Sequence, residues 1–154
     1  MRISGSGSQV VRDEFSVMTE KMDFVGAEVL ELGCGGAARA EQIAKQTEVA
    51  SIIAAEIDLV AHRKNLEKSI EKVEFASFGA QAIPLQDESV DIVIMLKSLH
   101  HVPQPLMSQS LQEIHRILRV GGVAYLSEPV FQGALNEVIR LFHDEESVRK
   151  FAFD

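Results

Sequence analysis

Hydrophobic positions along the chain alternate between short apolar runs and longer stretches in which apolar residues recur at helical spacing. The apolar runs predict strands at residues 28–32, 51–57, 73–78, 90–96 and 123–127. Helical spacing predicts helices at residues 9–22, 37–46, 59–70, 106–118 and 133–142, with Gly121-Gly122 ending the fourth, and a last short helical segment from Asp144. Because strands and helices alternate, and the strands look buried on both faces, we expect an α/β fold with a doubly wound parallel sheet.

Composition narrows the class of protein. Hydrophobic residues make up 46% and charged residues 25% of the chain, as in ordinary globular domains. The net charge of −8 argues against a generic nucleic-acid binder. A single cysteine excludes an internal disulfide and a multi-cysteine metal site, and favours a cytoplasmic setting. No apolar run reaches the roughly 18 residues of a membrane span.

The domain organisation is simple. Residues 1–8, which contain Ser4-Gly5-Ser6-Gly7-Ser8, are typical of a flexible leader. Residues 9–154 are expected to form one domain. The predicted helix at 9–22 either packs on the sheet or also covers a ligand site.

A glycine-rich turn, Gly33-Cys34-Gly35-Gly36, follows the first predicted strand directly. Glycine permits positive φ and lets a ligand approach the backbone, and the helix starting near Ala37 points free N–H groups at the turn. Ligands of doubly wound sheets bind beyond the carboxyl ends of the strands. By itself this turn could serve a dinucleotide, a flavin, S-adenosylmethionine or no ligand.

Two acidic residues in or directly after predicted strands narrow the choice of ligand. Glu31 lies inside an apolar strand, where a buried carboxylate is costly unless it is paired, either with a cationic ligand group or within the protein. Glu56 follows Gly35 by twenty-one residues, and an acid there can accept hydrogen bonds from both hydroxyls of a ribose. Asp58 is expected to cap the next helix. A dinucleotide would need room for a second half beyond the fourth strand, where the chain offers no second glycine turn.

Taken together, five segments resemble, in order and spacing, the motifs of class I S-adenosylmethionine-dependent methyltransferases, especially the bacterial small-molecule type of methyltransferase domain 11. These segments are Glu31-Leu32-Gly33-Cys34-Gly35, Glu56-Ile57-Asp58, residues 80–91, Leu99-His100-His101-Val102-Pro103 and Leu118-Arg119-Val120-Gly121-Gly122. The resemblance covers about residues 29–129. It implies a Rossmann-like fold, S-adenosylmethionine as cofactor, and in-line transfer of a methyl group to a small-molecule acceptor.

The resemblance also implies which residues bind the cofactor. They are Glu31, Gly33, Cys34, Gly35, Glu56, Ile57, Gly79, Ala80, Gln81, Leu96 and Lys97. Among them, Glu31 would lie near the amino-acid end, Glu56 would hold the ribose, and Ile57 would pack on the adenine. The backbone of residues 33–35 would pass close to the methionine and ribose, Ala80 would donate its N–H to the adenine, and residues 96–97 would contact the methionine part.

The sequence departs from the family's pattern at three points. Gly79 stands where the family usually has an acid that reaches the adenine amino group, and the Gln81 carbonyl could substitute for it. Ala37 replaces a frequent glycine, which is a mild change. Family members usually continue with an antiparallel hairpin, so we expect a fragment, a truncated relative, or a homodimer that covers the edge of the fifth strand.

Candidate catalytic groups lie after the fourth and fifth strands. His100 and His101 could supply a general base if the acceptor must lose a proton, although a packing or loop-fixing role is the stronger expectation. Lys97 could meet an acidic substrate or the cofactor's carboxylate, or remain solvated. Glu128 could face the acceptor. Cys34 is not expected to act as a nucleophile.

Three hypotheses about function remain open. The leading one is a methyltransferase that acts on a small molecule, without a metal ion. The second is a cofactor-binding domain of the same fold with lost or weakened turnover. The third is a nicotinamide-dependent oxidoreductase on the same architecture.

Overall fold

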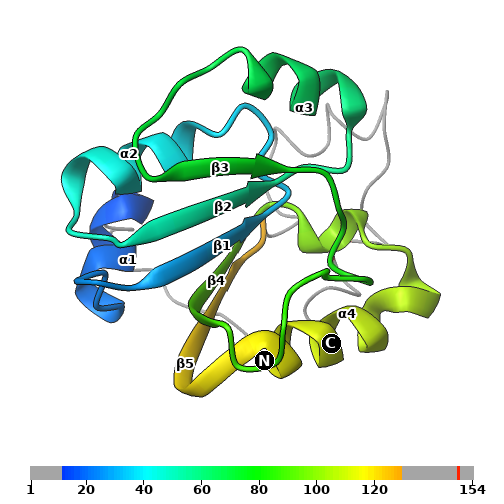
Figure 1. Cartoon of the computed structure of the whole chain (residues 1–154). Coiled ribbons are helices and arrows are strands. Elements are labelled where there is room, and N and C mark those ends of the chain that lie inside the picture. The colour runs from blue at the N-terminus through cyan, green and yellow to red at the C-terminus, as the bar shows by residue number, and fades with distance from the viewer. Residues whose placement is uncertain (1–11, 130–148, 150–154) are drawn as a thin grey trace, which may run out of the picture.

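The structure, a computed structural model, describes residues 12–129 and Arg149 and contains a five-stranded parallel sheet (Figure 1). The strands are β1 (Glu28–Leu32), β2 (Ser51–Ala55), β3 (Val73–Ala76), β4 (Val90–Leu96) and β5 (Leu118–Ser127), in the order β3-β2-β1-β4-β5. The helices are α1 (Glu14–Lys21), α2 (Ala38–Gln46), α3 (Leu59–Leu66) and α4 (Met107–Ile117), with short 3₁₀ turns η1 (Leu99–His101) and η2 (Gln104–Leu106). The predicted α/β doubly wound fold is confirmed. The predicted leader and the helical segments after residue 130 lie outside the described residues.

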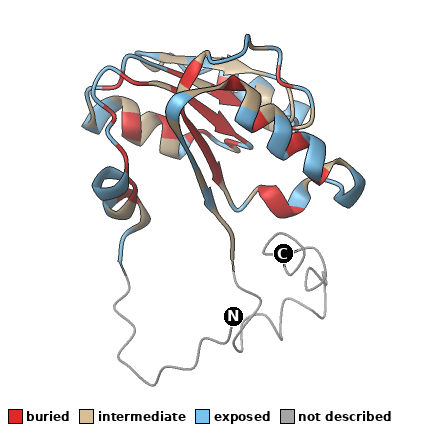
Figure 2. Cartoon of the chain, turned by 90° about the horizontal axis from the view of Figure 1, so that it is seen from below, coloured by how far each residue is buried: buried red, intermediate tan, exposed pale blue. Residues whose placement is uncertain are grey.

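Helices cover both faces of the sheet, and each face has its own apolar core. On one face Val29 of β1 packs with Met18 of α1 and Ile43 of α2, and on the other Leu30 packs with Ile117 of α4. All five of these side chains are almost completely buried, and burial of each contributes about 1.5–3 kcal/mol. Figure 2 shows the buried central strands between helices whose outer faces are exposed, whereas the edge strands β3 and β5 are only partly buried.

Element boundaries agree with the sequence where a strong local signal exists. The predicted bounds of β1 and β4 are those observed. Asp58 caps α3, as predicted, by accepting hydrogen bonds from Val60 N at 2.7 Å and Ala61 N at 3.4 Å. Asp13 caps α1 in the same way, so this helix begins at Glu14, later than predicted. β2, β3 and α3 all end earlier than predicted.

The predicted role of Gly121-Gly122 as the end of a helix is wrong. The helix ends at Ile117, and β5 begins at once with Leu118. The two glycines lie instead in an irregular part of the β4–β5 pairing, whose register shifts before Val123. A side chain at 122 would place its Cβ only 2.9 Å from the Asp91 carbonyl oxygen, so glycine is required for this close approach.

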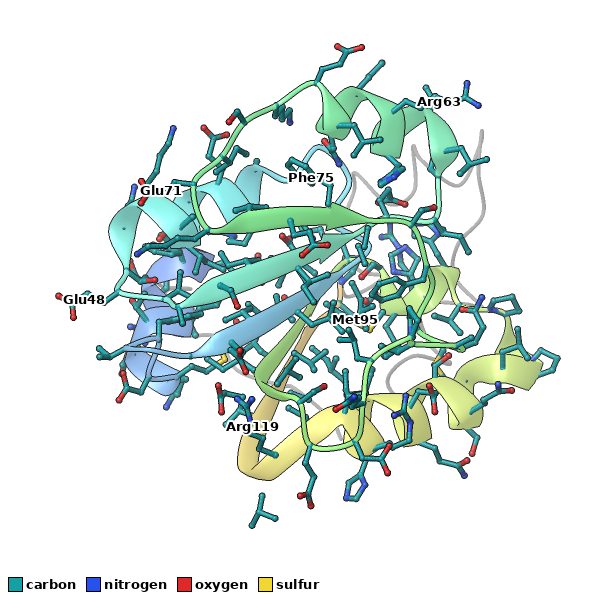
Figure 3. All side chains as sticks on the ribbon, viewed as in Figure 1. Glu48, Arg63, Glu71, Phe75, Met95 and Arg119 are labelled. Atoms are coloured by element: carbon teal, nitrogen blue, oxygen red, sulfur yellow. The ribbon has the colours of Figure 1, made fainter. Side chains whose placement is uncertain are left out.

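At the amino ends of the strands, Arg119 of β5 joins three neighbouring strands (Figure 3). Its guanidinium pairs with Asp91 at 2.7 Å and with Glu28. Asp91 also accepts a 2.8 Å hydrogen bond from Glu28 N, and this backbone contact is the main reason that the pKa of Asp91 is lowered. None of the described helices has the length and apolar character needed to cross a membrane.

Candidate functional site

Two adjoining cavities open at the carboxyl ends of the strands, as expected for a doubly wound sheet. The larger has a volume of about 600 Å³ and the smaller about 370 Å³. They share Gly33, Gly35 and Lys97. All eleven residues predicted to bind the cofactor line one cavity or the other, so the structure brings them together. Their contacts with a cofactor stay a prediction.

The glycine turn is fixed by strand β2 on one side and by the segment after β4 on the other. The N–H groups of Gly33 and Cys34 donate to the Ala55 carbonyl at 2.9 and 3.1 Å. Gly33 has a φ of +70°, and a Cβ there would lie 2.6 Å from the Cβ of Ser98. Ser98 also donates a 3.0 Å hydrogen bond to the Leu32 carbonyl. Glycine at position 33 is therefore required both for backbone conformation and for contact with Ser98.

Two buried side chains hold the peptide groups of Gly35. Glu56 accepts hydrogen bonds from Gly35 N at 2.7 Å and from Asp58 N at 2.9 Å. Asn65 of α3 donates a 2.7 Å hydrogen bond to the Gly35 carbonyl. A carboxylate has about four acceptor positions, so Glu56 can bind this turn and still accept from ribose hydroxyls. Sequence reasoning missed Asn65, since a lone polar residue in a helical pattern gives no sign that it is buried.

Among the acidic residues of this region, Glu31 has the largest shift in pKa. Its side chain borders the smaller cavity and is buried, and one carboxylate oxygen has no partner among the described residues. Burial raises the pKa of Glu31 to about 7, although a hydrogen bond with the backbone of Ala40 and the charge of Arg39 act to lower it. A cationic ligand group in the smaller cavity would lie beside this carboxyl group and favour its ionised form.

Two other predictions concern the same cavity. Burial raises the pKa of Cys34 to about 12, in agreement with the expectation that this thiol is not a nucleophile. Helix α1 both packs on the sheet through Phe15 and Met18 and borders the smaller cavity through Glu14. The packing role predicted for the N-terminal helix is confirmed, and its role as a cover of the ligand site stays a prediction.

The far wall of the larger cavity is formed by residues 79–81. The Gln81 side chain lies against Gly79, so that a Cβ at 79 would be 2.4 Å from the Gln81 amide oxygen. The Gln81 amide thus occupies the position where the family's acid would begin. Helix α4 fixes this wall, because Gln109 donates to the Gln81 carbonyl at 2.8 Å and Glu113 accepts from Ile83 N at 3.0 Å. An amide can both accept from and donate to an adenine edge.

The two histidines have different surroundings. His101 is exposed and lines the larger cavity. His100 is buried and contacts the carboxylate of Glu128, whose other oxygen accepts a 2.7 Å hydrogen bond from Leu99 N. Neither His100 nor Glu128 lines either cavity, so their contacts fit the loop-fixing role rather than a direct one. The catalytic role of His101 stays a prediction.

Comparison with known proteins identifies the class to which this fold and site belong. The family model described as "Methyltransferase domain" matches residues 30–126, more than half of the chain. The chain therefore belongs to the class I S-adenosylmethionine-dependent methyltransferases, and the resemblance seen in the motifs is confirmed. The cofactor of this class is S-adenosylmethionine, and the match favours methyl transfer over nicotinamide chemistry.

Individual relatives place the chain within this class. It is 28% identical over 124 residues to methyltransferase GfsG of Streptomyces halstedii, covering 77% of this chain and 44% of the relative. It is 32% identical over 111 residues to a ubiquinone biosynthesis O-methyltransferase of Pseudomonas putida, covering 70% of this chain and 47% of the relative. The chain thus spans less than half the length of these curated relatives.

The fold also matches solved structures. The crystal structure of the [4+2]-cyclase SpnF superposes with a TM-score of 0.67 at 24% identity, covering 77% of this chain and 45% of SpnF. At this level of identity the match shows the fold alone. Because that protein is named a cyclase, the fold by itself does not decide which reaction is performed.

Proposed function

We propose that the protein transfers a methyl group from S-adenosylmethionine to a small-molecule acceptor. The observation that carries this proposal is the pair of cavities that meet at Gly33 and Gly35. The smaller is lined by the charged side chains of Glu31 and Arg39, and the larger contains Glu56 and a mainly apolar wall. This division matches a cofactor with a charged amino-acid tail at one end and a nucleoside at the other.

Each part of the site has a task that its chemistry suits. Glu31 would pair with the ammonium group of the tail, Glu56 would accept from the ribose hydroxyls, and Ile57 would pack against the adenine. Gln81 would contact the adenine edge from the position above Gly79. The cofactor supplies a methyl group already activated on a sulfonium, so the chain mainly has to position the acceptor and exclude water. If the acceptor must lose a proton, His101 is the exposed base at the cavity wall.

Calorimetry with S-adenosylmethionine tests the proposal. We expect the wild-type chain to bind it and Glu56→Ala to weaken binding by about tenfold or more, because a hydrogen bond to a charged group contributes roughly 1.5–3 kcal/mol. Glu48→Ala is the matched control, since Glu48 is exposed at the opposite end of the sheet from Met95 (Figure 3). Absence of binding by wild-type protein with a folded circular-dichroism spectrum would refute the proposal.

We further propose that the acceptor is a small molecule and that the protein acts in the cytoplasm. The names of the curated relatives, which include a ubiquinone biosynthesis O-methyltransferase, support a small molecule rather than a macromolecule as acceptor. The acidic net charge of −8 disfavours nucleic acid, and the single cysteine fits a cytoplasmic setting. A homodimer through the edge of β5 remains part of the same proposal.

A second candidate is a cofactor-binding protein that does not transfer methyl groups. Two observations favour it: the family's acid is absent at Gly79, and a solved structure of the same fold is named a cyclase. Release of S-adenosylhomocysteine in the presence of any acceptor from a panel of small phenols, carboxylates and amines would exclude this candidate. Tight cofactor binding without release from the whole panel would favour it.

A further inference from the structure

Lys97 occupies the junction of the two cavities, directly after β4. It lines both cavities and is exposed. Its φ is +55°, and its N–H donates a 2.7 Å hydrogen bond to the Ser127 carbonyl. This left-handed conformation favours glycine, so a lysine is accepted here against the backbone's preference. The presence of a lysine rather than a glycine at this position therefore suggests that the lysine side chain has a role in the site.

The amino-acid end of the site does not need Lys97 as its cation. The smaller cavity has its own guanidinium, Arg39, held by a 2.6 Å hydrogen bond to Gln42 and lying 5.7 Å from the centre of the Phe15 ring. With Glu31 beside it, Arg39 completes a pair of opposite charges suited to an amino acid's ammonium and carboxylate. Across residues 12–129, no carboxylate forms an ion pair with Lys97.

Apolar side chains predominate in the part of the larger cavity formed by β4 and the segment that follows it. Met95, Val102, Pro103 and Leu106 line it there, together with the polar side chains of Ser98 and His101 (Met95 is labelled in Figure 3). An anion in such surroundings is costly unless a cation pairs with it. An ammonium at the mouth of an apolar cavity thus selects a ligand with one negative charge on an apolar body.

We infer that the acceptor is an apolar anion, a carboxylate or an ionised phenol, and that Lys97 recognises its charge. This inference rests on the proposed methyl transfer. An acceptor that enters as an anion has no proton to lose: its oxygen forms the new bond to carbon as the bond between carbon and sulfur breaks, with the bonding electrons left on sulfur. The product is a neutral methyl ester or ether. A cationic acceptor is disfavoured, because both the ammonium and the sulfonium repel it.

The first arm of the test asks whether Lys97 serves the cofactor instead. The affinities of Lys97→Met and Lys97→Arg for S-adenosylhomocysteine and for 5′-methylthioadenosine, which lacks the amino-acid tail, are measured by calorimetry. We expect changes of less than about threefold for both ligands. If Lys97→Met weakens S-adenosylhomocysteine by about tenfold or more and spares methylthioadenosine, Lys97 pairs with the cofactor's carboxylate and the inference is overturned.

The second arm measures charge recognition in protein saturated with S-adenosylhomocysteine. The probes are 2-naphthoate and 2-naphthamide, which share size and shape and differ in charge. We expect wild-type protein to prefer the carboxylate by about tenfold or more, Lys97→Met to lose this preference, and Lys97→Arg to keep most of it. Lys45→Met, a change at an exposed lysine of α2, is the control and should behave as wild type.

The outcomes separate the two proposals. If wild-type protein does not bind S-adenosylhomocysteine, the proposed function fails and the inference falls with it. If it binds S-adenosylhomocysteine but shows no charge preference, binds neither probe, or keeps its preference in Lys97→Met, the inference alone is overturned.

Discussion

The buried carboxyl group of Glu31 should make the protein less stable as the pH rises. Burial raises its pKa from the usual 4.5 to about 7. Because one pKa unit corresponds to ~1.4 kcal/mol, this rise of roughly 2.5 units represents about 3 kcal/mol. The side chain is only 3% exposed, so solvent does little to reduce this value. Replacement by glutamine, which has the same shape and cannot ionise, should remove the effect.

The direction follows from which state holds the proton. Below pH 4.5 the carboxyl group is protonated in both folded and unfolded chains, and its contribution is fully present. Between pH 4.5 and 7 the unfolded chain releases the proton while the folded chain keeps it, so the folded state loses relative stability. Above pH 7 both are ionised and the loss is complete. Glu31→Gln should therefore match wild type near pH 4 and exceed it by about 3 kcal/mol near pH 8.

Thermal unfolding followed by circular dichroism between pH 4 and pH 9 measures this difference. For a chain of this size each kcal/mol shifts Tm by roughly 2–4 °C, so Glu31→Gln should unfold about 6–12 °C higher than wild type at pH 8. Glu48→Gln, at an exposed acid, is the control and should follow wild type throughout. If the Tm curves of Glu31→Gln and wild type run parallel across this range, the assigned burial of a neutral carboxyl group is wrong.

Glu31→Gln should raise the stability of the protein but weaken its binding of the cofactor. An ammonium group beside Glu31 favours the ionised form, so binding at pH 6.5 should release roughly 0.8 proton from a group with a pKa of about 7. Calorimetry of S-adenosylmethionine binding in two buffers of different ionisation enthalpy measures this release. Glu31→Gln should bind more weakly and release no proton from this site. Equal proton release by the variant and wild type would place the ionising group elsewhere.

The glycine turn gives two further predictions. Gly33→Ala should destabilise the protein by about 2–4 kcal/mol in urea unfolding and abolish cofactor binding, because its Cβ would lie 2.6 Å from Ser98 in a backbone of positive φ. The double variant with Ser98→Gly should recover part of this loss, and no recovery would show that the contact is not the cause. Asn65→Ala should cost about 1–3 kcal/mol of stability and weaken cofactor binding, because it removes the donor to the Gly35 carbonyl. Unchanged calorimetric affinity in Asn65→Ala would contradict a role for this side chain in holding the turn.

Local signals in the sequence are sufficient to predict most of the strands and the residues that line the site at their carboxyl ends. The continuous apolar runs of β1 and β4 define their own ends, because a buried strand must stop where polar or glycine residues begin. Glu31 and Glu56 can be recognised from the sequence because a carboxylate inside or directly after an apolar strand is unusual. Parallel strands bring their carboxyl ends to one edge, so residues far apart in sequence could be placed around one cleft.

The contacts that the sequence did not reveal join segments distant along the chain. Asn65 reaches Gly35 across 30 residues, and Ser98 reaches Leu32 across 66, so no local pattern identifies either pair. The prediction that Gly121-Gly122 ends a helix is wrong for a related reason. A glycine pair after a helical pattern is typical of a helix end, whereas here the close approach of the Asp91 backbone requires glycine at position 122. In each case packing between elements, rather than local propensity, decides the conformation.

The central position of β1 has a consequence for the newly made chain. β1 pairs with β4 on one side, and Glu28 N donates to Asp91, a residue 63 positions later. At a synthesis rate of about 5–20 residues per second, this partner emerges roughly 3–13 s after β1 does. During that interval the first half of the sheet has an uncovered inner edge and an apolar face, both prone to aggregation. The chain is therefore expected to be most prone to aggregation before β4 has been translated, whatever the stability of the finished fold.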